Sequence, residues 1–301
     1  MIYAYAMYKP NPVPKAAAIH DLSGFGRSSL TVVIPVLSTM GIQACPLPTA
    51  ILSTHTSEFQ DYHFVDFTDE MEAFIAHWKS LAINFDAVYS GFLGSARQVD
   101  IVKSFITAFR QENQIIVVDP VLGDDGETYD TITGDLVSQM TELVTMADVI
   151  TPNVTEAALL LGEPANLPHE AFTTPMIKDW LKRLAECGPE IVIITSIPVI
   201  DQPKLSSVVA YDKTNDKFWQ VQCTYIPAYF PGTGDIFTSV MTGSLLRGQS
   251  LPIALDRSVQ FVTQAIRASF GHDYPRREGV LLEAVLDNLR APIINTSYEL
   301  F

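Results

Sequence analysis

The chain contains 301 residues, of which 48% are apolar and 18% are charged, and its formal net charge is −15 at pH 7. This composition supports a large hydrophobic core and excludes disorder as the main state. Because acidic residues outnumber basic ones by 34 to 19, binding to nucleic acid through a basic face is excluded as well. A phosphate ligand is compatible with this charge, since backbone amides and a metal ion can hold it locally.

The cysteines and the hydropathy of the sequence indicate in which cellular compartment the protein is expected. Cys45, Cys187 and Cys223 lie far apart in the sequence, so a disulfide scaffold is excluded and a reducing compartment is expected. No apolar run approaches the ~18 residues that a membrane span needs. Residues 1–15 hold three tyrosines and three prolines without a continuous apolar stretch, unlike a signal peptide. We expect a cytoplasmic protein with no membrane partner, in which an N-terminal extension, residues 1–15, precedes a single domain, residues 16–301.

Short apolar runs alternate along the chain with stretches of helical periodicity. The apolar runs are Ala16–Ile19, Ala87–Tyr89, Ile115–Val118, Val149–Ile150 and Ile191–Ile194. Two of them, 115–118 and 191–194, are apolar at every position, as expected for central strands of a parallel sheet covered on both faces. Apolar stripes with helical spacing span 30–37, interrupted by Pro35, then 99–109 and 177–184. For the last stripe, Thr174 is the expected cap and Pro175 the first helical residue.

The alternation predicts an α/β fold with right-handed crossovers between mostly parallel strands. Two later segments, Ser206–Tyr211 and Phe218–Val221, flank the polar sequence 213–216. This arrangement predicts an antiparallel hairpin at one edge of the sheet.

Polar or turn residues directly follow four of the apolar runs. They are Ser90-Gly91, Asp119-Pro120, Thr151-Pro152-Asn153 and Thr195-Ser196. In open α/β sheets, ligands bind outside the carboxyl ends of the strands. We therefore expect these residues to lie along one edge of the sheet and to form a binding site there.

The most informative local motif runs from Gly232 through Thr233 and Gly234 to Asp235, ahead of an apolar-striped helix. Two glycines in a strand-to-helix turn let backbone N–H groups converge on an anion, and the helix N-terminus adds a partial positive charge. The same field favours the ionised form of Asp235, which suits a general base acting on an alcohol that attacks a phosphoryl group. Alternatively, the glycines only form a tight turn and Asp235 only complements the helix dipole.

Two common nucleotide-binding motifs are missing from the sequence. No G-x-x-x-x-G-K-[ST] sequence occurs in the chain, so a Walker A loop is excluded. The glycine spacing of a dinucleotide fingerprint fails at Phe237, and Gly24-Phe25-Gly26 lacks the third glycine. A Rossmann dehydrogenase is therefore disfavoured.

A second group of candidate residues is acidic. The segment from Asp119 to Gly126 contains three carboxylates that could hold Mg²⁺ directly or through water, although acidic turns with glycines are also common in loops. Downstream, Asn153 and Glu156 lie three residues apart at an expected helix start. Alone, this spacing is more typical of a capping box than of a ligand site.

Taken together, these motifs resemble the ribokinase-like superfamily of small-molecule kinases, and specifically its pyridoxal kinase branch, from about Ile19 to Leu289. The matching motifs are Ser53-Thr54-His55-Thr56, Ser90-Gly91-Phe92-Leu93-Gly94-Ser95, Asp119-Pro120-Val121-Leu122-Gly123-Asp124, Thr151-Pro152-Asn153 with Glu156, and Gly232-Thr233-Gly234-Asp235. The Gly-x-Gly-Asp motif by itself identifies only the superfamily, whereas five motifs in the family's order make the resemblance specific. The resemblance implies a three-layer α/β/α sandwich with a mostly parallel central sheet.

The resemblance also implies a reaction, transfer of the γ-phosphoryl group of ATP to the 5′-hydroxyl of pyridoxal, pyridoxine or pyridoxamine. Asp235 would be the catalytic base, and the amides of Gly232, Thr233 and Gly234 would form the anion hole. The residues implied at ATP are Asp119, Asn153, Glu156, Thr195 and Ser196, with Asp119 and Glu156 at Mg²⁺. Residues 123–129 are the expected lid, a monovalent cation such as K⁺ can take part, and homodimers are usual in this family.

On the vitamer side, the resemblance assigns ring contacts to Asp21, Ser23, His55, Thr56 and Phe92. Phe92 stands where the family usually has Tyr, so it can stack on the ring but cannot donate a hydrogen bond. Without the resemblance, a His between two Thr in a loop is more often a hydrogen-bonded surface residue.

Two alternatives stay open at this stage. The segment His20 to Gly26 also resembles the start of hydroxymethylpyrimidine kinases, which share the fold and mechanism but phosphorylate a different alcohol. A vitamer- or nucleotide-sensing protein without catalysis is the other alternative, and the intact Gly232–Asp235 motif counts against it.

Overall fold

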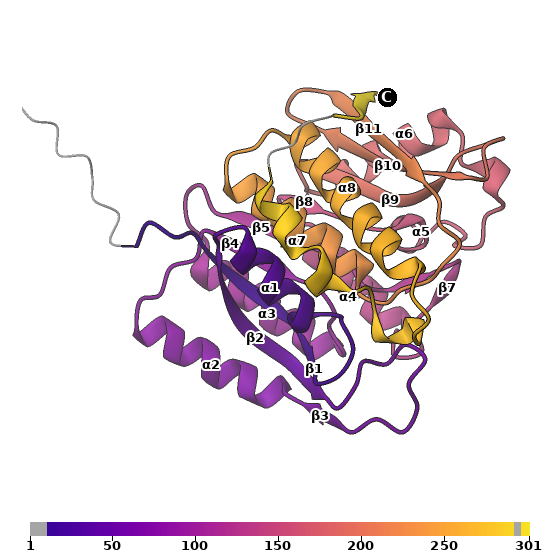
Figure 1. Cartoon of the computed structure of the whole chain (residues 1–301). Helices are drawn as coiled ribbons and strands as arrows, with labels where there is room; N and C mark the ends of the chain where they lie inside the picture. Colours follow the sequence, from indigo (N-terminus) through magenta and orange to yellow (C-terminus); the bar gives the residue numbers. More distant parts are fainter. Residues whose placement is uncertain (1–10, 292–295) are drawn as a thin grey trace, which may run out of the picture.

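The computed structural model describes residues 11–291 and 296–301. One ten-stranded sheet runs through these residues in the order β12-β11-β10-β9-β8-β5-β4-β1-β2-β3, with helices on both of its faces (Figure 1). The strands of this sheet are β1 Lys15–Ser23, β2 Gln43–Leu52, β3 Phe64–Asp66, β4 Ala87–Ser90, β5 Ile115–Val118, β8 Val149–Ile150, β9 Ile191–Pro198, β10 Leu205–Asp212, β11 Lys217–Thr224 and β12 Tyr298–Leu300. The predicted three-layer α/β architecture is thereby confirmed.

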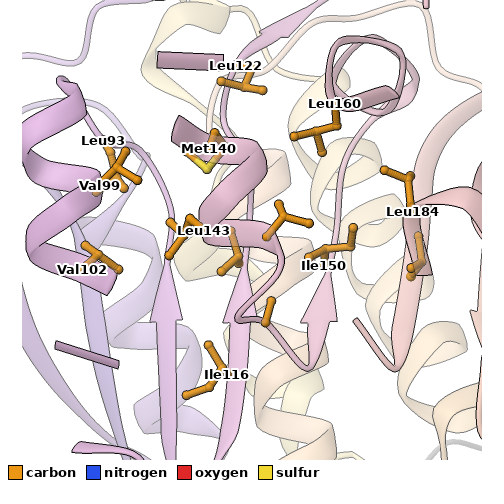
Figure 2. Packing of buried hydrophobic residues seen from close by; sticks show 14 of the residues in the cluster. Leu93, Val99, Val102, Ile116, Leu122, Met140, Leu143, Ile150, Leu160 and Leu184 are labelled. Carbon is orange, nitrogen blue, oxygen red and sulfur yellow. The ribbon is translucent and has the colours of Figure 1, made fainter. Parts of the chain in front are cut away.

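Two helical layers bury the apolar residues of the sheet. The helices are α1 Leu30–Thr39, α2 Thr68–Ser80, α3 Ala96–Phe109, α4 Gly134–Val144, α5 Val154–Leu161, α6 Thr174–Glu186, α7 Thr233–Leu246 and α8 Leu251–Phe270. The buried side chains of α2 to α6 form one cluster with one face of the sheet, and those of α1, α7 and α8 form another with the opposite face. Figure 2 shows the first cluster, where Leu143 of α4 lies among side chains from strands and neighbouring helices.

The central strands are parallel and the outer ones antiparallel. Strands β2, β1, β4, β5, β8 and β9 pair in parallel, whereas β3 pairs antiparallel with β2. The predicted hairpin is confirmed as β10 and β11, but β12 pairs with β11 and takes the outermost position. The hairpin therefore belongs to the antiparallel edge of the sheet, as predicted, and β12 extends that edge by one short strand.

One local prediction needs correction. The cap of α6 is Thr173, whose side chain accepts a hydrogen bond from the amide of Met176, so Thr174 is the first helical residue. Pro35 lies inside α1, where it interrupts the apolar stripe as expected. Strand β1 begins at Lys15, and residues 1–10 of the predicted extension lie outside the described residues.

Strand β2 was not predicted, and its sequence explains why. It contains Pro46 and Pro48, which lack the N–H that a strand normally donates. The antiparallel partner of β2, strand β3, pairs only with residues 50–52. The prolines are therefore tolerated because that side of the strand has no partner next to them.

A matched pair of leucines tests the core. Leu143 is 0% exposed in the cluster beneath α4, and Leu81 at the end of α2 is 58% exposed. We expect Leu143→Ala to lower the free energy of unfolding by about 2–5 kcal/mol, because it leaves a cavity, and Leu81→Ala to change it by less than about 0.5 kcal/mol. Urea unfolding of both variants measures the difference, and equal losses would contradict the packing described for α4.

Candidate active site

The start of α7 is fixed by a left-handed turn against the loop that follows β1. Gly232, the residue before the helix, has φ 81°. A Cβ built on Gly232 would lie 2.2 Å from the carbonyl oxygen of Arg27. Only glycine combines this conformation with so close an approach of two backbones. The expected strand-to-helix turn is less direct than predicted, since residues 225–231 separate it from the end of β11.

Asp235 lies in the first turn of α7 and is held from the other side of the site. Its Oδ2 accepts a 2.7 Å hydrogen bond from the backbone amide of Ser29, and its side chain is 14% exposed. The pKa of Asp235 is raised to about 8, mainly by burial and to a smaller extent by the nearby Asp119 and Asp21, while the hydrogen bond from the Ser29 amide opposes the shift. The helix field was expected to favour the ionised form of Asp235, but loss of hydration raises the pKa by more than the groups that favour ionisation lower it.

His20 of β1 lies beside this carboxyl and is fully buried. Its Nδ1 is 3.9 Å from Oδ1 of Asp235, and its ring meets Tyr89 edge to face at 4.3 Å between centroids. Burial lowers the pKa of His20 to about 3, so the imidazole is neutral at physiological pH. Within the described part of the chain, neither of its ring nitrogens has a hydrogen-bond partner.

The glycine of the Ser90-Gly91 motif makes room for this histidine. A Cβ at Gly91 would lie 2.2 Å from Nδ1 of His20. Glycine is therefore required at position 91 by the packing of His20, which the sequence pattern did not reveal.

The predicted vitamer-side residues are partly brought together. Oδ2 of Asp21 accepts a 3.1 Å hydrogen bond from the Ser23 hydroxyl, and Oδ1 accepts a 2.5 Å bond from the Ser29 hydroxyl. Burial raises the pKa of Asp21, while these two bonds and the nearby His55 oppose the shift. Asp21 in turn raises the pKa of Asp235, so β1 brings the expected ring-contact residue close to the expected base.

His55 is buried rather than on the surface. Its Nε2 is 2.6 Å from the carbonyl oxygen of Arg277, its ring packs edge to face against Phe59, and the residue is 5% exposed. The surface interpretation of His55 was therefore wrong. Thr56 is exposed and Phe92 is half-buried.

Asp119, which follows β5, and Glu156, in the first turn of α5, form a buried acidic pair. The two oxygens of Asp119 accept hydrogen bonds from the hydroxyls of Thr151 and Thr238, each 3.2 Å long. Burial raises the pKa of Asp119 to about 6, although the hydrogen bonds from these two hydroxyls lower it. Burial, with the added repulsion of Asp119, raises the pKa of Glu156 well above its ordinary value.

The capping-box interpretation of Asn153 and Glu156 is confirmed. The Asn153 side chain accepts from the Glu156 amide at 2.9 Å, and Oε2 of Glu156 accepts from the Asn153 amide at 2.8 Å. The other carboxylate oxygen of Glu156 accepts from the amide of Leu122 at 3.1 Å. Both oxygens of Glu156 therefore accept backbone hydrogen bonds, just as both oxygens of Asp119 accept hydrogen bonds from hydroxyl groups.

Thr195 and Ser196 lie inside β9, not at its end, which corrects the prediction. The Thr195 amide donates to the carbonyl of Pro152 at 2.9 Å, and Thr195 forms a β-bridge with Asn153. Ser196 is exposed and has φ 59°. Both therefore stand next to the capping box, although the strand continues past them.

The expected lid, residues 123–129, is a small hairpin of strands β6 (Gly123–Asp124) and β7 (Glu127–Thr128). Its base is tied to the start of α5: the Asn153 side-chain amide donates to the carbonyl of Gly123, and the Gly126 amide donates to the Thr155 hydroxyl. A role as a lid stays a prediction.

Three residues of this site were missed by the sequence analysis: Ser29, His20 and Thr238. Ser29 precedes an apolar helical stripe, which is a usual position for a capping serine. His20 directly precedes Asp21 in a motif that was already of interest. Thr238 has no sequence signal, because only the packing of α7 against β5 brings its hydroxyl to Asp119.

A comparison of two glycines with positive φ distinguishes the effect of backbone strain from the effect of close packing. Gly248 has φ 74° and nothing within 4 Å of a built Cβ, whereas a Cβ on Gly232 would meet the carbonyl of Arg27. We expect Gly248→Ala to lower stability by about 1 kcal/mol through the backbone alone and to leave phosphoryl transfer unchanged. Gly232→Ala should also push α7 away from the loop and reduce turnover at least ~10-fold. Thermal unfolding and steady-state kinetics compare the two, and equal behaviour would contradict the close contact.

Comparisons with known proteins agree with this geometry. The sequence profile of the phosphomethylpyrimidine kinase family matches residues 34–276. A protein of Bacteroides thetaiotaomicron, whose assignment as a phosphomethylpyrimidine kinase is provisional, was crystallised in an orthorhombic form with pyridoxal; it is 55% identical, with 96% of this chain and 100% of that chain covered and a TM-score of 0.92. The pyridoxal kinase of Lactobacillus plantarum is 30% identical, with 92% and 96% covered and a TM-score of 0.83.

A curated relative found by sequence comparison is also a kinase of B6 vitamers. The pyridoxine/pyridoxal/pyridoxamine kinase of Bordetella avium is 26% identical over 252 residues, which cover 80% of this chain and 81% of that protein. The chain therefore belongs to the phosphomethylpyrimidine kinase family, a ribokinase-like family of small-molecule kinases, and is similar to the pyridoxal kinases.

Proposed function

We propose that this protein transfers the γ-phosphoryl group of ATP to the 5′-hydroxyl of pyridoxal, pyridoxine or pyridoxamine. The observation that carries the proposal is the position of Asp235, whose carboxyl stands at the N-terminus of α7 beside the Gly232 turn and is held by the Ser29 amide. The similarity to the Bacteroides protein crystallised with pyridoxal supports this choice of substrate.

In the proposed reaction, Asp235 accepts the proton of the 5′-hydroxyl while that oxygen forms a bond to the γ-phosphorus. The bond from the γ-phosphorus to the bridging oxygen breaks, and ADP leaves with the electron pair. The amides of Gly232, Thr233 and Gly234 at the start of α7 would stabilise the charge on the transferring group. The chain contributes position and electrostatics rather than a covalent intermediate.

The acidic pair is chemically suited to Mg²⁺. Asp119 and Glu156 are buried close enough for Asp119 to raise the pKa of Glu156, and a cation would relieve that repulsion. We propose that Asp119 and Glu156, together with Asn153, organise the ion and the phosphates of ATP, and that Thr195 and Ser196 lie near the nucleotide phosphates. The ion would neutralise phosphate charge. A monovalent cation such as K⁺ remains an expectation from the resemblance.

The vitamer side of the proposed site comprises residues from three segments. Asp21 and Ser23 end β1, His55 and Thr56 follow β2, and Phe92 follows β4. We propose that Phe92 stacks on the pyridine ring and that the polar residues contact its substituents.

Phosphorylation of a hydroxymethylpyrimidine is the second candidate function. The matching family profile and the provisional assignment of the Bacteroides protein favour it. Both candidates use the same base and anion hole, so only the alcohol distinguishes them.

Three further properties belong to the same proposal. We propose that residues 16–301 form one kinase domain, that the protein is a homodimer, and that it acts in the cytoplasm. In the described residues, no helix is long and apolar enough to cross a membrane.

A substrate panel tests the function. Purified protein is given MgATP with pyridoxal, pyridoxine, pyridoxamine or hydroxymethylpyrimidine, and ADP and the phosphorylated alcohol are measured. We expect turnover on at least one B6 vitamer. Turnover on hydroxymethylpyrimidine alone would favour the second candidate function. No turnover on any of the four alcohols would contradict the proposal.

Replacing the base tests its role. We expect Asp235→Asn to reduce turnover at least ~10²-fold, because the amide cannot accept the hydroxyl proton, while ATP binding measured by calorimetry stays within about twofold. Asp287→Asn is the matched control, since Asp287 is exposed and lies in the C-terminal 3₁₀ segment 286–290. Near-full activity of Asp235→Asn would remove Asp235 from the mechanism.

The pH dependence of kcat/KM tests the state of the same carboxyl. Because burial raises the pKa of Asp235 to about 8, the free protein holds the proton at pH 6 and loses it as the pH rises. We therefore expect kcat/KM to increase between pH 6 and 9, since only the ionised carboxylate acts as a base. A profile that is flat across this range would contradict the raised pKa.

A further inference from the structure

Ser29 contacts both of the carboxyl groups on the vitamer side of the site. It is the last residue before α1 and is 7% exposed. Its hydroxyl donates to Oδ1 of Asp21 at 2.5 Å, and its backbone amide donates to Oδ2 of Asp235 at 2.7 Å. One residue therefore links the end of β1 to the first turn of α7.

The backbone of Ser29 is strained. Its φ is 50° and its ψ is −133°, a conformation that glycine adopts readily and that costs other residues about 1–3 kcal/mol. Such a conformation persists only where the surrounding structure fixes it. At Ser29 it aims the amide at Asp235 while the side chain reaches Asp21.

We propose that Ser29 is a positioning residue, which holds Asp21 and Asp235 at a fixed separation so that an alcohol bound against Asp21 meets the base. The inference rests on the proposed function and assigns to Ser29 a role in the reaction. The two contacts of Ser29 have different consequences. Its hydroxyl orients Asp21 and so acts on vitamer affinity, whereas its amide orients Asp235 and so acts on turnover.

The surroundings of Asp21 show why the hydroxyl matters. Without the 2.5 Å bond from Ser29, Asp21 would keep only the 3.1 Å bond from Ser23 among its side-chain partners in the described residues. The charged and titratable groups that face it are Asp235 and His55. Neither is a cation at physiological pH, since burial lowers the pKa of His55. The Ser29 hydroxyl is therefore the main side-chain donor to this carboxyl.

Three variants separate the two contacts. Ser29→Ala removes the hydroxyl and keeps the amide and the strained backbone. Ser29→Gly removes the hydroxyl and also frees the backbone. Ser28→Ala is the matched control, because Ser28 is also buried and its hydroxyl has no hydrogen-bond partner in the described part of the chain.

We expect Ser29→Ala to raise the pyridoxal dissociation constant and KM about 10-fold, as for the loss of one bond to a charged group, with kcat and the KM for MgATP within about twofold. Ser29→Gly should lose the same affinity and, in addition, lower kcat at least ~5-fold, because its amide is no longer held. Its melting temperature should exceed that of Ser29→Ala, since the strain is released. Ser28→Ala should leave both affinities and kcat within about twofold.

An equal rise in the pyridoxal and MgATP constants of Ser29→Ala would overturn the inference, because it would show a general structural defect. Unchanged pyridoxal affinity would overturn it as well. These outcomes are read against an active wild-type protein. A wild-type protein without turnover would instead refute the proposed function, and pyridoxal binding measured by absorbance without ATP would still decide between the variants. A wild-type protein that binds no pyridoxal would refute both the proposed substrate and the role of Ser29.

Discussion

The close contact between the start of α7 and the loop after β1 is the constraint on which the rest of the site depends. Gly232 can approach the carbonyl of Arg27 only without a side chain, and the Ser29 amide then reaches Asp235 across the same junction. Helices α1 and α7 pack on the same face of the sheet, so the apolar layer beneath them holds the junction in place. One backbone contact thus sets the relative positions of the proposed anion-binding turn, the proposed base and the proposed vitamer contacts.

Burial, rather than the helix dipole, sets the electrostatics of this junction. Loss of hydration raises the pKa of four carboxyls here, those of Asp21, Asp119, Glu156 and Asp235. Keeping several acids in a poorly hydrated site opposes stability, and such conflicts are characteristic of functional sites rather than of structural cores. Bound Mg²⁺ and the donors of the chain would offset that cost, which is consistent with a protein that accepts a phosphorylated nucleotide despite its charge of −15.

The sequence was most informative where local pattern and tertiary environment agree. The uniform apolar runs at 115–118 and 191–194 became central strands, and the Gly-x-Gly-Asp motif marked the start of α7. Strand β2 was missed because its prolines contradict strand propensity, and they are tolerated only where the neighbouring strand is short. The contacts of Ser29 with Asp235 and of Thr238 with Asp119 could not be predicted, since each joins residues more than one hundred positions apart. The ionisation of Asp235 was misjudged because burial is a tertiary property.

The central claim is that the carboxyl of Asp235 is buried where α7 meets the loop after β1 and holds its proton until the pH approaches 8. Carbon-13 NMR of protein labelled at its aspartate carboxyls measures this directly, with Asp235→Asn used to assign the resonance. The account predicts a titration midpoint near pH 8 in the ligand-free protein. A midpoint near the ordinary aspartate value of about 4 would show that the carboxyl is hydrated and that the junction does not enclose it as described.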